Sequence, residues 1–126
     1  MVRPDWNTYF MEIAKVVASR ATCPRGQVGA AIVKDNRILA TGYNGSLPGE
    51  SHCTEVGCLM IDGHCERTVH AETNAVIQAS KFGVSVSGAT IYVWRSLHSE
   101  TGKPVPVCFK CDQVIKSSGI VKVIMN

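Results

Sequence analysis

The sequence lacks long apolar runs, has few aromatic residues and contains no block of basic residues. The uninterrupted apolar stretches hold only a few residues, whereas roughly 20 are needed to cross a bilayer. The 13 Lys and Arg residues are scattered along the chain and aromatic residues make up 6%, which argues against a nucleic-acid-binding surface. We therefore expect neither a membrane nor a nucleic acid as partner.

The N-terminal residues 1–7 also lack the basic start and the apolar core of a signal peptide. This absence predicts a cytoplasmic protein, whose six cysteines are metal ligands or buried thiols rather than disulfides. The 126 residues are 45% hydrophobic and 18% charged, which is typical of one compact domain covering residues 1–126. The net charge of +3 is compatible with a small anionic substrate.

The hydrophobic pattern predicts an α/β fold. Apolar residues three or four apart predict an amphipathic helix over residues 5–20 that begins at Asp5. Two β-branched stretches around Asp35 and Asn36 predict a hairpin, and residues 44–63 read as a loop. The expected elements are strands at 27–34, 37–43, 89–94 and 120–125, helices at 68–82 and 108–118, and a loop at 95–107. This α-β-β-α-β-α-β order predicts a mixed central sheet with helices packed on it in three layers.

Two short motifs at predicted helix starts carry the chemistry. A catalytic zinc takes three nitrogen or sulfur ligands and keeps one position for water, and His70, Cys108 and Cys111 supply that set. Bound zinc lowers the pKa of its water towards neutrality, and Glu72 can then move the protons. Separately, the Cys pair could be a structural or redox site and the histidine a surface residue. Together, H-x-E and C-x-x-C form the signature of zinc-dependent nucleobase deaminases.

Across nearly its whole length the sequence resembles the deoxycytidylate (dCMP) deaminase family, especially its short bacterial and phage members. The matching stretches are residues 22–25, 28–30, 42–46, 52–53, 57–60, 64–65, 67–72, 74–75 and 88–93. The resemblance implies a cytidine-deaminase-like fold, zinc-dependent conversion of dCMP to dUMP with release of ammonia, and a bacterial or phage-infected host cytoplasm. It further implies a homo-oligomer, often a hexamer, with dCTP as activator and dTTP as inhibitor.

The resemblance also assigns roles to individual residues. Glu72 is the catalytic residue, Asn44 contacts the nucleotide, and Arg25 is a candidate for the phosphate. Backbone N–H groups near Ala71 and Cys108 hold the base edge. A plainer interpretation of Gly42-Tyr43-Asn44-Gly45 is a hairpin exit whose glycines serve backbone angles.

Four cysteines remain outside the catalytic motifs: Cys23, Cys53, Cys58 and Cys65. Because some family members bind a second zinc here, we expect a structural zinc held by these thiols, with His52 or His64 as a further candidate ligand. Free buried thiols are the alternative, since cysteine is among the most buried residue types.

The sequence departs from the family pattern between the third predicted strand and Cys108. Residues 94–107 are longer than usual, and Val107 stands where relatives have proline. Arg95, His98 and Lys103 could meet a phosphate there, or simply be solvated. Another cytosine substrate, such as deoxycytidine, dCTP or a modified cytosine, therefore stays open. A non-enzymatic zinc-stabilised interaction module is the second alternative, although a closed structural site has no use for Glu72.

The chain ends directly after the last predicted strand. An exposed sheet edge at that strand would need covering by a partner chain. This expectation agrees with the oligomer that the resemblance implies.

Overall fold

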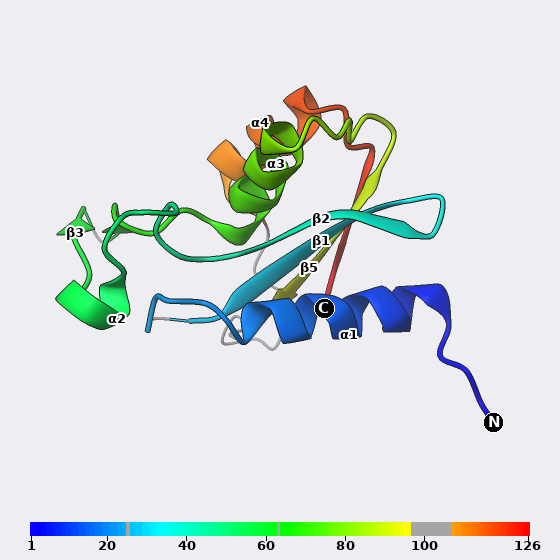
Figure 1. Ribbon diagram of the computed structural model, residues 1–126, viewed down its shortest axis with the longest axis horizontal. Helices are drawn as coiled ribbons and strands as arrows, with labels where there is room; N and C mark the ends of the chain where they lie inside the picture. Colours follow the sequence, from blue (N-terminus) through cyan, green and yellow to red (C-terminus); the bar gives the residue numbers. More distant parts are fainter. Residues whose placement is uncertain (25, 63, 97–106) are drawn as a thin grey trace.

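The computed structural model describes residues 1–24, 26–62, 64–96 and 107–126. A four-stranded sheet lies between helix α1 on one face and helices α3 and α4 on the other (Figure 1). This arrangement confirms the predicted three-layer α/β fold. The predicted phosphate candidates Arg25, His98 and Lys103 lie outside the described residues. Within those ranges, every helix is too short or too polar to traverse a lipid bilayer.

Helix α1 (Trp6–Ala18) begins where the sequence predicts. The Asp5 carboxylate accepts a hydrogen bond from the backbone N–H of Thr8 at 2.7 Å, and this bond lowers the pKa of Asp5. The buried face of the helix carries Phe10, which packs against the Tyr92 ring with a centroid separation of 5.4 Å. An aromatic contact of this kind fixes the helix on the sheet.

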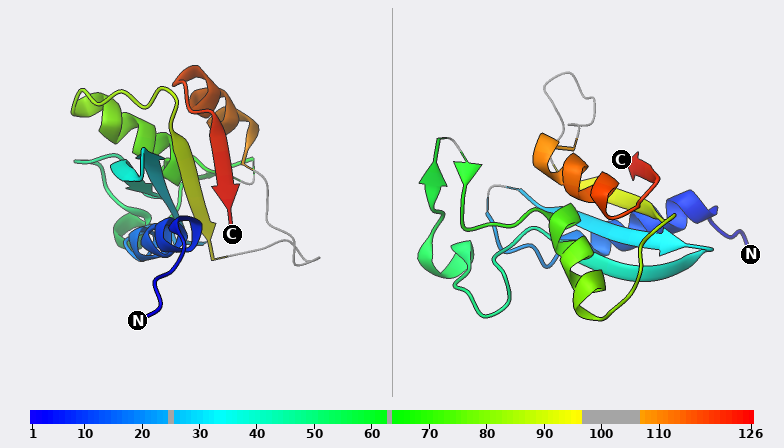
Figure 2. Two further views of the ribbon diagram at one scale, coloured as in Figure 1. Left: turned by 90° about the vertical axis from the view of Figure 1, so that its right-hand side faces the viewer. Right: turned by 90° about the horizontal axis from the view of Figure 1, so that it is seen from above.

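The sheet is mixed, as predicted. Strands β1 (Val28–Lys34) and β2 (Arg37–Tyr43) form an antiparallel hairpin. Its turn residues Asp35 and Asn36 both have positive φ, at 52° and 59°, as a type I′ turn requires. Strand β5 (Thr90–Arg95) pairs antiparallel with β1, and β6 (Lys122–Met125) pairs parallel with β5 (Figure 2). The order β2-β1-β5-β6 leaves β2 and β6 at the two edges.

Helices α3 (Ala71–Lys81) and α4 (Phe109–Ser117) cover the other face. Helix α3 starts three residues later than predicted, because His70 has an extended backbone and serves as the N-cap. Gly42 does not have positive φ, so the backbone-angle explanation is wrong for it. A Cβ at this position would instead collide with the backbone nitrogen of Ala75. The missing side chain therefore lets β2 approach α3.

The predicted loop at 44–63 contains more structure than expected. It includes the short helix α2 (Cys53–Val56) and is followed by a small hairpin of β3 (Met60–Ile61) and β4 (His64–Cys65). These elements lie beyond one end of the central sheet (Figure 1). They are too short to produce a hydrophobic period, so the sequence pattern could not reveal them.

Candidate active site and metal centres

The three predicted catalytic zinc ligands come together at the N-terminal ends of two helices. His70 is the N-cap of α3 and Cys108 the N-cap of α4. The Nδ1 atom of His70 lies 3.3 Å from the Sγ atoms of both Cys108 and Cys111. A tetrahedral zinc at usual bond lengths would separate ligand nitrogen and sulfur by about 3.6 Å. The three side chains, hereafter the triad, thus fit a zinc ion and leave one coordination position free for water.

Glu72 lies on the first turn of α3 beside the triad. Its side chain is 1% exposed, and Oε2 lies 3.4 Å from the Nη2 atom of Arg95. Its other oxygen, Oε1, is buried without a hydrogen-bond partner among the described residues. An unsatisfied buried acceptor costs about 1–3 kcal/mol or more, so this atom favours a ligand or water that donates to it. Glu72 does not share the cluster of ligand atoms, in keeping with a proton-moving role.

Burial controls the protonation of the buried triad thiol. It raises the pKa of Cys111 to about 12, and the negative charges of Glu72 and Cys108 add to the rise, while a hydrogen bond from Thr73 opposes it. Zinc ligation requires the thiolate. Metal binding is therefore expected to release protons from this site.

Two cavities lie next to the triad. One, of about 200 Å³, is lined by His70, Ala71, Asn44 and Arg95 among others. The other, of about 460 Å³, is lined by the triad and the exposed Phe109. A small molecule in the first cavity would lie beside His70 and the start of α3, which is where the predicted chemistry requires it.

Asn44 lines the first of these cavities, and its carboxamide is already engaged. Its Oδ1 accepts a hydrogen bond from the Val28 N–H, and its Nδ2 donates to the Gly26 carbonyl, each at 2.8 Å. These bonds tie the end of β2 to the start of β1. The predicted nucleotide contact of Asn44 stays a prediction.

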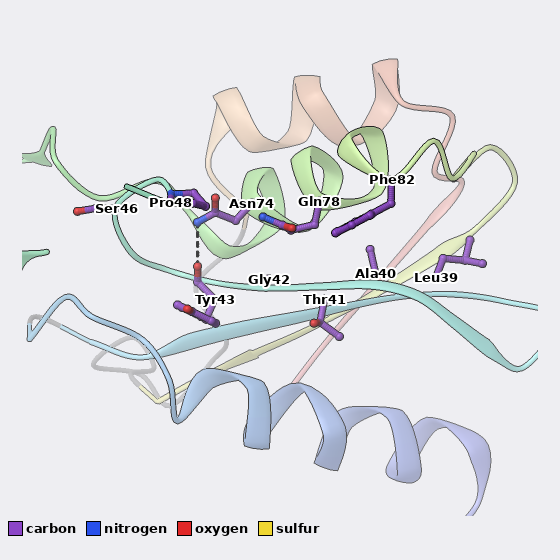
Figure 3. A pocket seen from close by; sticks show the side chains of 10 residues that line it. All are labelled: Leu39, Ala40, Thr41, Gly42, Tyr43, Ser46, Pro48, Asn74, Gln78 and Phe82. Atoms are coloured by element: carbon purple, nitrogen blue, oxygen red, sulfur yellow. Dashed lines mark hydrogen bonds between the residues drawn. The ribbon is translucent and has the colours of Figure 1, made fainter. Parts of the chain in front are cut away.

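A further cavity, of about 480 Å³, lies between β2 and α3 (Figure 3). Asn74 donates from Nδ2 to the Tyr43 carbonyl at 2.9 Å beside it, and Phe82 lines it on the side away from Ser46 and Pro48. None of the triad residues lines this cavity. It is separate from the chemistry at the helix starts.

The remaining four cysteines also form one cluster, hereafter the quartet. The Sγ atoms of Cys23, Cys53, Cys58 and Cys65 all lie within 4.8 Å of one another, and all four are free thiols. The Sγ atoms of Cys53 and Cys65 lie 3.5 Å apart, near the roughly 3.8 Å between sulfurs of a tetrahedral Cys₄ zinc. The quartet therefore fits a closed metal site.

His52, a further candidate ligand of the quartet, is less suited to it than the four cysteines. His52 Nδ1 lies 3.0 Å from the Thr22 hydroxyl and does not belong to the cluster of ligand atoms. The side chain of His64 lies outside what the structure describes. The four sulfurs alone complete the four ligands that a structural zinc needs.

The thiols of the quartet differ in acidity. Burial raises the pKa of Cys58 to about 12, helped by hydrogen bonds with Cys53 and Cys23. Burial would also raise the pKa of Cys65, but hydrogen bonds from Thr68 and Cys53 outweigh it and lower the pKa to about 6. Cys65 therefore ionises readily near neutral pH. The ionised form, the thiolate, is the one that binds a metal.

The contact between Arg95 and Glu72 was not predicted. The sequence places Arg95 in a loop and offers it only as a phosphate candidate, whereas the structure makes it the last residue of β5. Asn126 holds its backbone at both ends, accepting from the Arg95 N–H at 2.9 Å and donating to its carbonyl at 3.0 Å. No local sequence signal pairs Arg95 with a residue of α3, because only the tertiary fold brings β5 next to that helix.

The fold and the triad together are typical of zinc-dependent deaminases. The sequence model described as the cytidine and deoxycytidylate deaminase zinc-binding region matches residues 4–126, and the chain therefore belongs to this family.

Individual relatives agree with this assignment. The chain is 52% identical to ComE operon protein 2 of Bacillus subtilis, over 95% of this chain and 58% of that protein, so it spans somewhat more than half of that relative. It is 36% identical to the deoxycytidylate deaminase of Mycobacterium phage D29, over 98% and 96% of the two chains. The crystal structure of the dCMP deaminase from cyanophage S-TIM5 in complex with dCMP and dUMP is similar, with a TM-score of 0.77 and 27% identity over 99% and 83% of the chains.

Proposed function

We propose that this chain is a zinc-dependent deaminase that converts dCMP and water to dUMP and ammonia. The observation that carries the proposal is the triad of His70, Cys108 and Cys111 beside the buried Glu72, whose Oε1 lacks a partner among the described residues. The similarity to the dCMP deaminases of Mycobacterium phage D29 and cyanophage S-TIM5, over 96% and 83% of those chains, supports dCMP as the substrate.

Each residue has a distinct task in this reaction. His70, Cys108 and Cys111 would hold zinc, which when bound lowers the pKa of a coordinated water towards neutrality. Glu72 takes a proton from the attacking water and delivers protons to the ring nitrogen and to the departing amine. Its burial keeps bulk water away from the carboxylate, so that a bound substrate need not compete with solvent for it.

The substrate-binding residues extend the proposal. Ala71 and Asn44 both line the cavity of about 200 Å³. This shared position supports binding of the base edge by the backbone at Ala71 and contact of Asn44 with the nucleotide. Arg25 remains the proposed phosphate contact from its position in the sequence. We also propose that residues 1–126 form one deaminase domain, since β5 and α1, from distant parts of the chain, share one core.

The test is the ultraviolet change of cytosine to uracil in the zinc-loaded protein. We expect conversion of dCMP to exceed that of CMP, deoxycytidine and dCTP. Turnover of another cytosine compound but not of dCMP would replace the substrate and keep the chemistry. Failure on every cytosine compound, with zinc bound, would contradict the proposal and favour a zinc-stabilised interaction module.

A second zinc ion in the quartet is part of the proposal. The four sulfurs match a closed tetrahedral site, whose metal would stabilise the segment around α2. Elemental analysis should return two zinc ions per chain. A single zinc ion that is lost when Cys108 is changed would leave the quartet as free thiols.

The proposal also includes a homo-oligomer, with a hexamer as the expected form. We further propose that dCTP activates the enzyme, that dTTP inhibits it and that it is located in the cytoplasm. Strand β6 is an edge of the sheet, and Val121 directly before it is 74% exposed. An unpaired edge and an exposed apolar side chain support association of copies. Sedimentation velocity with and without dCTP tests the assembly, and a monomer under both conditions would contradict it.

A further inference from the structure

Arg95 contacts Glu72, the residue proposed to move the protons. Its Nη2 atom lies 3.4 Å from Glu72 Oε2, and its side chain lines the small cavity with His70, Ala71 and Asn44. The Arg95 side chain is only 19% exposed, so it is part of the cavity wall and not a solvated surface group. In this position it competes with any ligand for the carboxylate.

The ion pair between Arg95 and Glu72 is incompletely made. Arginine and carboxylate groups often pair through two short parallel hydrogen bonds of about 2.7–2.9 Å, whereas here a single contact spans 3.4 Å. The Arg95 Nε and the Glu72 Oε1 are both buried and lack partners among the described residues. The pair therefore leaves one donor and one acceptor unsatisfied, and the bound ligand would have to supply their counterparts.

A cytosine nucleotide carries the two missing partners. The exocyclic amine of its base is a hydrogen-bond donor that suits the unpaired Glu72 Oε1. Its phosphate is an acceptor of the kind that arginine binds best. A nucleoside has the same base but no phosphate, so it can displace Arg95 without offering it a new partner.

The size of the cavity agrees with a movement of this side chain. With Arg95 against Glu72 the cavity measures about 200 Å³, below the roughly 300–1,000 Å³ of pockets that enclose drug-sized ligands. Asn126 holds the backbone of Arg95 on both sides, so the strand can remain in place while the long side chain turns. Turning the guanidinium away from Glu72 would enlarge the cavity next to Ala71.

We propose that Arg95 selects nucleotides over nucleosides: it pairs with Glu72 in the free protein and turns to the substrate phosphate when a nucleotide binds. This proposal rests on the proposed function and names the residue that gives it substrate specificity. It explains both unsatisfied atoms with one ligand.

The test compares the activities of Arg95→Gln on dCMP and on deoxycytidine. We expect kcat/KM for dCMP to fall by about 10- to 100-fold, the size of one lost hydrogen bond to a charged group, while kcat/KM for deoxycytidine is unchanged or rises. Arg95→Lys keeps the charge and should restore part of the preference. Arg37→Gln, which changes an exposed arginine at the start of β2, is the matched control and should alter neither substrate.

A binding measurement separates this proposal from the reaction itself. Calorimetry on zinc-loaded Glu72→Gln should show that Arg95→Gln weakens dCMP binding and leaves deoxycytidine binding unchanged. Equal losses for both ligands would overturn the proposal, because the contact would then be with the base or sugar. Unchanged affinities for both ligands would also overturn this proposal. In either case, dCMP turnover by the unaltered protein would still support the proposed function.

Discussion

The triad and the quartet lie close together, and Cys65 and Thr68 line both cavities beside the triad. The triad offers one nitrogen and two sulfurs, and a buried carboxylate stands next to it. The quartet offers four sulfurs and therefore leaves no coordination position for a substrate. Two clusters of similar residues can thus serve different purposes, and the number of ligands together with Glu72 distinguishes them.

The largest effect should come from Glu72→Gln, which removes the proposed proton carrier and preserves the shape of the side chain. General acid–base catalysis contributes about 10²- to 10⁴-fold, so we expect kcat to fall by at least that range. The metal content and melting temperature should change little, because the triad is intact. Kinetics on the zinc-loaded variant, with elemental analysis of the same sample, check this prediction.

Turnover by Glu72→Gln close to that of the unaltered protein would mean that another group moves the proton. Glu66→Gln provides the control carboxylate, since Glu66 also lies near the triad but is exposed, whereas Glu72 is buried. We expect this control to keep its activity.

The next effect separates the two clusters directly. Cys58→Ser should lower the melting temperature by roughly 10 °C or more, because a structural metal contributes to folding. Cys108→Ser should abolish activity and leave the quartet metal in place. Thermal denaturation, zinc analysis and dCMP turnover on both variants measure the contrast. If Cys58→Ser leaves melting temperature and metal content unchanged, the quartet holds no structural zinc.

The smallest effect sharpens the comparison through two threonines. The Thr68 hydroxyl hydrogen-bonds with the Sγ atoms of Cys53 and Cys65, at 3.3 and 3.5 Å. The Thr73 hydroxyl hydrogen-bonds with the Sγ atom of Cys111 at 3.5 Å. Thr68→Val should cost about 1 kcal/mol of unfolding free energy and lower kcat/KM less than the matched change at the triad does.

Thr73→Val is the matched change at the triad. It should lower activity more than it lowers the free energy of unfolding. Denaturant unfolding and steady-state kinetics on both variants test the pair. An activity loss in Thr68→Val as large as that in Thr73→Val would show that the two clusters work as one unit.

Sequence patterns predicted the long elements well and the region around the quartet poorly. Helix α1 and the β1–β2 hairpin follow from apolar spacing, from Asp5 and from a two-residue turn. The segment that holds α2, β3 and β4 follows no such pattern, because elements of two to four residues have no period to detect. The cysteines mark the segment, although their spacing alone cannot show that four sulfurs converge.

The sequence by itself determined the class of the protein, because a histidine, a glutamate and a C-x-x-C pair at two helix starts are chemically specific even without coordinates. Only the tertiary structure decided what surrounds them. It brought Cys23 to the other three thiols and placed Arg95 against Glu72. Contacts between residues far apart in the chain depend on how the helices and strands pack. The local sequence around each residue does not show which distant residue it will contact.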